Sequence, residues 1–181
     1  METPYRLPCG VELPNRLCKP AMSEQIAFRS GCPSPELINL YKIWGEQGKA
    51  GLIITGNVMV EERFTEPRNA VLQDEKFMDS YKKMAVACKL GGGKAIMQIS
   101  HPGRVGTLPL LDPVGPSSVV VDIPLANFRK PRALTVNEIE VLINKFAITS
   151  ELAIKAGFDG IQIHGSFNVN VYLAIYHFVV N

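Results

Sequence analysis

The chain has 181 residues, of which 46% are hydrophobic and 20% charged, and 19 basic against 17 acidic side chains give a net charge of +2. This length suits one domain with a buried core, and the composition excludes disordered, collagen-like and disulfide-scaffold chains. The balanced charge argues against nucleic acid or an anionic membrane as main partner. Four scattered cysteines and no long apolar run predict a cytoplasmic protein without a metal site or membrane span.

Four short apolar runs predict β-strands. They lie at residues 17–22, 51–55, 94–100 and 160–164. The first is the weakest, because Pro20 cannot donate to a strand ladder.

Helical patterns separate these runs, over residues 35–47, 75–90 and 135–157. We expect Ser34 to cap the first helix, and Thr135 with Glu138 to form a capping box on the last. The last helix is predicted to bury Ile139, Leu142, Ile143, Phe146, Ala153 and Ile154 on one face and to stop at Gly157.

Strands that alternate with helices predict a parallel sheet with crossover connections. Residues 102–132 form one unusually long connection with six prolines, which is typical of a functional loop or a lid.

Polar residues follow the predicted strands, at the edge where α/β proteins place their sites. They are Ser23 after the first strand, Asn57 after the second, Gln98 within the third and His164 at the end of the fourth. A simpler interpretation is that polar residues mark the strand ends, and a lone histidine is more often structural. His101 and Arg104 are most simply a strand-end cap and a solvated loop charge.

Several segments together resemble the old yellow enzyme family, the NADH:flavin oxidoreductase/NADH oxidase group. These are residues 13–16, 19–23, 51–60, 97–104, 131–135 and 156–165. The resemblance implies the N-terminal half of a (β/α)8 TIM barrel, with about four parallel strands and an open end. Residues 1–166 would form this partial barrel, and residues 167–181 a divergent apolar tail.

The resemblance also implies residue roles around FMN. Ala21, Met22 and Ser23 would lie along the flavin, Gly56 and Asn57 would reach it from the second strand, and Gln98 would bind its pyrimidine end. His164 would be the catalytic residue that binds the substrate oxygen. NADH or NADPH would reduce the flavin, which would then pass hydride to an activated alkene or a similar small acceptor.

The sequence departs from the family pattern after the fourth strand. Phe167 stands where a second ligand of the substrate oxygen is usual, and Val169 where a proton-donor tyrosine is usual. Three hypotheses therefore stay open. The chain is a shortened FMN-dependent oxidoreductase, an inactive half-barrel that associates with itself or a partner through its open sheet edges, or a small nucleotide-binding domain of another class.

Overall fold

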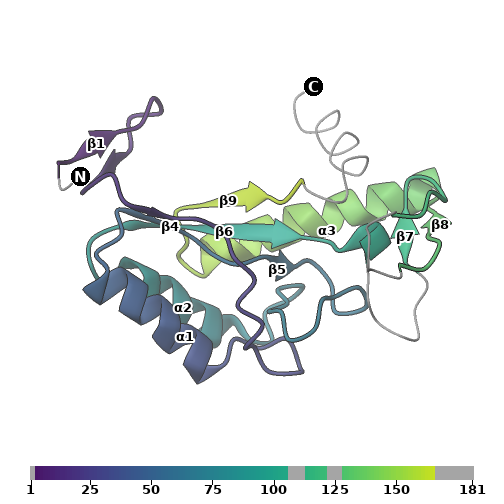
Figure 1. The fold of residues 1–181 in the computed structure, drawn as a ribbon, viewed down its shortest axis with the longest axis horizontal. Helices are drawn as coiled ribbons and strands as arrows, with labels where there is room; N and C mark the ends of the chain where they lie inside the picture. The colour runs from purple at the N-terminus through teal and green to yellow at the C-terminus, as the bar shows by residue number, and fades with distance from the viewer. Residues whose placement is uncertain (1–2, 106–112, 122–127, 166–181) are drawn as a thin grey trace.

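The computed structural model describes residues 3–105, 113–121 and 128–165. They form a parallel sheet with helices along one side (Figure 1). The strands are β1 Tyr5–Arg6, β2 Glu12–Leu13, β3 Cys18–Lys19, β4 Leu52–Ile54, β5 Val58–Met59, β6 Lys94–Ser100, β7 Val114–Gly115, β8 Arg132–Ala133 and β9 Gly160–Ile163. The helices are α1 Pro35–Lys42, α2 Met78–Lys89 and α3 Val136–Lys155, with a π-helical turn at Ile43–Gln47 and a 3-10 turn at Gly103–Val105.

The main sheet confirms the predicted parallel arrangement. β3 pairs with β4, β4 with β6 and β6 with β9, and every pair is parallel. β5 continues the line of β4 and pairs with the last two residues of β6. The four predicted strand positions are therefore filled in the expected order, with the second split into β4 and β5.

A bulge causes this split. Three residues, 55–57, separate β4 from β5, whereas only Met97 and Gln98 separate their partners on β6. One extra residue on one strand bends it and re-aims nearby side chains, which is a common arrangement beside functional sites.

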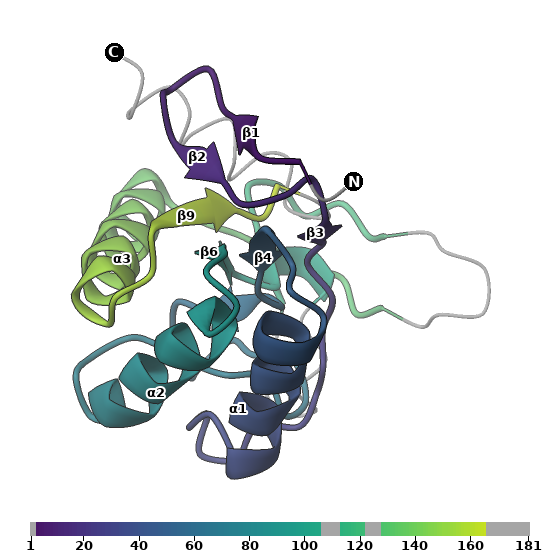
Figure 2. The same cartoon turned by 90° about the vertical axis from the view of Figure 1, so that its left-hand side faces the viewer.

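The three helices lie on the outer side of the curved sheet (Figure 2). The core fills the layer between them, and its members are fully buried apolar side chains such as Tyr41, Ile53, Met84, Met97 and Ala153. Because the helices cover only one face, the other face is left to carry polar side chains.

The predicted helix ends agree with the structure. Ser34 accepts a hydrogen bond from the Leu37 N–H, and Thr135 and Glu138 form the capping box. Gly157 follows α3 with a φ of +95°, a left-handed conformation that glycine adopts without steric cost.

Two expectations need correction. Ile154 is 54% exposed, and Thr149 and Leu152 are buried on α3 instead, because the helix turns a slightly different face to the sheet. α2 begins at Met78, since Asp74 accepts the Lys76 N–H in a turn. The long connection also contains the short parallel pair β7–β8, and its role as a functional loop or lid stays a prediction.

The sequence patterns did not predict the antiparallel pair β1–β2 near the N-terminus. Its strands have two residues each, which is too short for a periodic signal. No helix in the described part of the chain is long and apolar enough to cross a membrane.

Candidate functional site

The inner face of the sheet carries amide side chains. Ala95, Met97 and Ile99 of β6 are fully buried in the core layer, so strand alternation directs Gln98 to the opposite, inner face. Gln98 lies in register with Gln162 of β9, and its Nε2 donates to Gln162 Oε1 at 2.8 Å. Two amides thus meet on the face that the helices leave open.

The bulge holds the backbone of Gln98. Thr55 is fully buried, and its Oγ1 accepts the Gln98 N–H at 3.1 Å. The same hydroxyl donates to the Gly56 carbonyl oxygen at 2.9 Å. The Thr55 hydroxyl therefore replaces the backbone hydrogen bond that β6 loses at the bulge. It connects β6 to the end of β4.

A second polar group joins the ends of the first two strands. Ser23 Oγ donates to Asn57 Oδ1 at 2.5 Å, and Asn69 Nδ2 donates to the same oxygen at 3.0 Å. Asn57 Nδ2 donates to Glu66 Oε2 at 3.1 Å. These partners fix the orientation of the Asn57 amide and leave one of its N–H groups for another acceptor.

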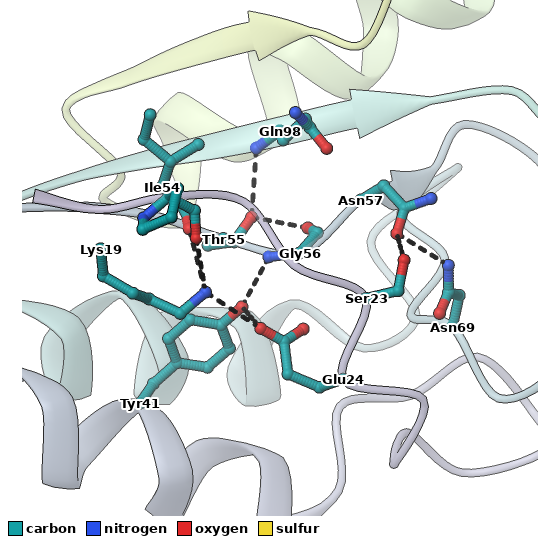
Figure 3. A network of polar contacts seen from close by, with 11 residues as sticks. Lys19, Ser23, Glu24, Tyr41, Ile54, Thr55, Gly56, Asn57, Asn69 and Gln98 are labelled. Carbon is teal, nitrogen blue, oxygen red and sulfur yellow. Dashed lines mark hydrogen bonds and ion pairs between the residues drawn. The ribbon is translucent and has the colours of Figure 1, made fainter. Parts of the chain in front are cut away.

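A buried network lies behind these residues (Figure 3). Lys19 Nζ pairs with Glu24 Oε1 at 3.2 Å and donates to the Ile54 carbonyl oxygen at 3.3 Å. The Tyr41 hydroxyl donates to Glu24 Oε1 at 2.7 Å and accepts the Gly56 N–H at 2.7 Å. Burial and then the nearby Glu24 carboxylate raise the pKa of Tyr41 well above its usual value, so the phenol stays protonated.

The remaining predicted site residues lie at the same edge of the sheet. Met22 is 51% exposed, and Ala21 is half-buried beside it. His164 follows β9, and its N–H donates to the Ile99 carbonyl oxygen at 2.9 Å, which continues the ladder. It lies two positions after Gln162, so alternation places both on the inner face.

The structure thus brings most of the predicted residues to one edge. Ser23 contacts Asn57 directly, Gly56 contacts the network behind them, and Gln98 is connected to Gly56 through Thr55. Within the described ranges, the His164 side chain makes no hydrogen bond or ion pair with these residues. Phe167 and Val169 lie outside the described residues.

His101 and Glu61 form a separate buried group. His101 directly follows β6 and is 3% exposed, so the strand-end position predicted for it is a buried one. Its Nδ1 accepts the Gly103 N–H at 3.0 Å, and its Nε2 therefore donates to Glu61 Oε1 at 3.1 Å. Lys145 of α3 pairs with the other Glu61 oxygen at 2.5 Å.

The pKa of Glu61 reflects two opposing effects. Burial raises it, but the hydrogen bonds from His101 and Lys145 outweigh burial and hold the pKa below its usual value. A cavity of about 240 Å³ opens beside this group, between β8 and the first half of α3.

Sequence reasoning missed Gln162, Glu24 and Tyr41. The period of two that includes His164 could have indicated Gln162, but nothing local joins Glu24 to Tyr41, which lie 17 positions apart. Among the described residues, no three His, Cys, Asp or Glu side chains are grouped so that they could hold a metal ion.

Comparison with known proteins gives the family context. A profile of the NADH:flavin oxidoreductase / NADH oxidase family matches residues 3–181. The chain is 35% identical over 183 residues to the NADH-dependent flavin oxidoreductase iliE of Hypocrea jecorina, covering 90% of this chain and 45% of that protein. It is 37% identical over 170 residues to the NADH-dependent flavin oxidoreductase nadA of Aspergillus parasiticus, covering 84% and 38%.

Solved structures with the same fold include the old yellow enzyme homologue from Zymomonas mobilis, with a TM-score of 0.76 and 24% identity. The match covers 91% of this chain and 48% of that one. Morphinone reductase superposes equally well. The fold is accordingly part of a TIM barrel, as predicted, and the chain spans less than half the length of these relatives. The division at residue 166 stays a prediction.

Proposed function

The chain belongs to the NADH:flavin oxidoreductase / NADH oxidase family, and on that premise we propose that it forms the FMN-contacting wall of an NAD(P)H oxidoreductase. The acceptor would be an activated alkene or a similar small molecule. One observation carries the proposal. Residues Ser23, Gly56, Asn57 and Gln98, from three successive strands of a parallel sheet, are joined by hydrogen bonds at the edge where such folds bind ligands.

The donor set suits a flavin. The edge of an isoalloxazine alternates acceptors and N–H groups, and a primary amide offers both a donor and an acceptor to it. Gln98 Nε2 donates one N–H to Gln162, and Gln98 Oε1 has no hydrogen-bond partner among the described residues. Gly56 also fits a crowded site, because a Cβ there would lie 2.2 Å from the Met22 carbonyl oxygen.

The bound flavin would accept hydride from NAD(P)H and donate it to the acceptor. Ala21, Met22 and Ser23 would line one side of the flavin, and Gly56, Asn57 and Gln98 would fix its position. His164 would donate a hydrogen bond to the acceptor's carbonyl oxygen, where negative charge grows as hydride arrives. These roles are the ones that the family resemblance implies, and the strand positions and the chemistry of the residues support them.

An inactive half-barrel is the second candidate. The outer edges of β3 and β9 have no strand partner in the described ranges, and such edges favour pairing with another chain.

A titration with FMN tests the proposal. The purified 181-residue chain should quench FMN fluorescence saturably, retain a yellow chromophore after gel filtration and oxidise NADH or NADPH when a cyclic enone is added. His164→Ala should still bind FMN but lose most of the enone-dependent rate, by about 10²-fold or more. A folded, self-associating chain that binds no FMN would support the half-barrel instead.

A further inference from the structure

We propose that Lys19, Glu24 and Tyr41 form a positioning network, which sets the spacing between residues 21–23 and the turn at Gly56. The inference rests on the proposed function, which assigns these two segments to the flavin. None of the three side chains needs to touch the cofactor. Their part is to hold two strand ends in one arrangement from the side opposite the site.

Tyr41 connects the two segments through one oxygen atom. Its hydroxyl donates to Glu24, which directly follows residues 21–23, and accepts the N–H of Gly56. Tyr41 is fully buried on α1, so water does not compete for either bond. Because the phenol stays protonated, both bonds keep the same direction throughout the neutral pH range.

The contact leaves no room for adjustment. A Cβ added at Gly56 would lie 2.1 Å from Glu24 Oε2 and 2.2 Å from the Met22 carbonyl oxygen. The backbone of the second strand end therefore rests directly against the first. Because the two segments are packed this closely, and Tyr41 is hydrogen-bonded to both Glu24 and Gly56, a displacement of one segment displaces the other.

Lys19 performs the same task from β3. Its ammonium group donates to the Pro20 carbonyl oxygen at 3.0 Å and to the Ile54 carbonyl oxygen at 3.3 Å, and pairs with Glu24. The Lys19 and Glu24 side chains are each 9% exposed. Lys19 Nζ also lies 4.4 Å from the centre of the Trp44 ring. A buried pair with this many partners favours one geometry over its alternatives.

Tyr41→Phe is the direct test, because it removes one oxygen and little volume. Without that oxygen the Gly56 N–H loses its acceptor. We expect faster hydrogen exchange at the Gly56 amide, an FMN Kd raised about tenfold, and an altered visible spectrum of the bound flavin. The exchange measurement needs no flavin.

Tyr81→Phe is the matched control. Tyr81 is equally buried, but its hydroxyl has no hydrogen-bond partner in the described part of the chain. Thr135→Ala, which removes the cap of α3, controls for a general loss of stability. Both variants should keep the Gly56 protection, the Kd and the spectrum of the original chain.

Glu24→Gln separates the two halves of the network. Glutamine still accepts from Tyr41 but leaves Lys19 without its charge partner. We expect a raised FMN Kd with Gly56 protection retained. This variant also keeps the test open if Tyr41→Phe does not fold.

Two results would overturn the inference. One is equal Gly56 exchange in Tyr41→Phe and Tyr81→Phe, and the other is an unchanged Kd and spectrum in both network variants. If the original chain binds no FMN, the proposed function fails, and the exchange data alone decide whether the network positions Gly56.

Discussion

Gln98 and Gln162 face each other across two neighbouring parallel strands, and the Gln98 Nε2 donates to the Gln162 Oε1 at 2.8 Å. Gln98 is 8% exposed, whereas Gln162 is exposed. The Gln162 amide therefore orients the Gln98 amide and leaves the Gln98 carbonyl oxygen without a hydrogen-bond partner in the described part of the chain. This asymmetry predicts unequal effects of the two substitutions.

Gln98→Ala should raise the FMN Kd by roughly 10- to 100-fold, because the flavin loses an amide donor and acceptor. Gln162→Ala should raise it by no more than about threefold, since Gln98 keeps its place through its backbone bond to Thr55. Fluorescence titration of both variants measures the difference. Equal effects would show that Gln98 has no special part in binding.

Thr55→Val should destabilise the chain by about 1–3 kcal/mol, because the buried Gln98 N–H loses its acceptor while the side-chain shape is kept. Thr55→Ser retains the hydroxyl, so its loss of stability should be smaller than that of Thr55→Val. Urea unfolding of the two variants checks this order. A valine variant as stable as the serine variant would contradict the role assigned to the hydroxyl.

Gly56→Ala should lower the free energy of unfolding by about 1–3 kcal/mol and weaken FMN binding. The new methyl group would clash with the Met22 carbonyl oxygen, which is a backbone atom. Gly160→Ala is the matched control. Its nearest neighbour would be the Ile96 Cγ1 at 3.9 Å, an ordinary contact distance. Thermal unfolding with FMN titration should separate the two alanine variants clearly.

Glu61→Gln should make stability less dependent on pH. The pKa of Glu61 is lower in the folded chain than its usual value of 4.5, so its ionised form stabilises the fold fully above that pH. The contribution is lost as the pH falls through the folded-state pKa. At pH 7, we expect the free energy of unfolding of the original chain to exceed that of Glu61→Gln by about 1–3 kcal/mol.

The measurement is urea unfolding from pH 7 down to pH 3.5. The gap between the two proteins should narrow below pH 4.5. A gap that stays constant over this range would mean that the stabilisation does not come from the ionised carboxylate.

Sequence patterns were sufficient for the parts of the fold that depend on neighbouring residues. The run 94–100 is β6 without any change of boundary, and Thr135 with Glu138 caps α3 as expected. Both signals are local, since alternation and capping depend on residues at most a few positions apart. The order of strands and helices then predicted the parallel sheet.

The site itself needed the tertiary structure. The sequence by itself determined which residues lie at the strand ends, because the length of each apolar run and the polar residues that follow it are local features of the sequence. Only the tertiary structure decided that the Tyr41 hydroxyl lies between Glu24 and Gly56. It also decided that the Gln98 N–H, at the bulge, donates to the Thr55 side chain. Such contacts join residues 15 to 43 positions apart, and they form only when packing of helices on the sheet brings distant backbone segments within hydrogen-bond distance.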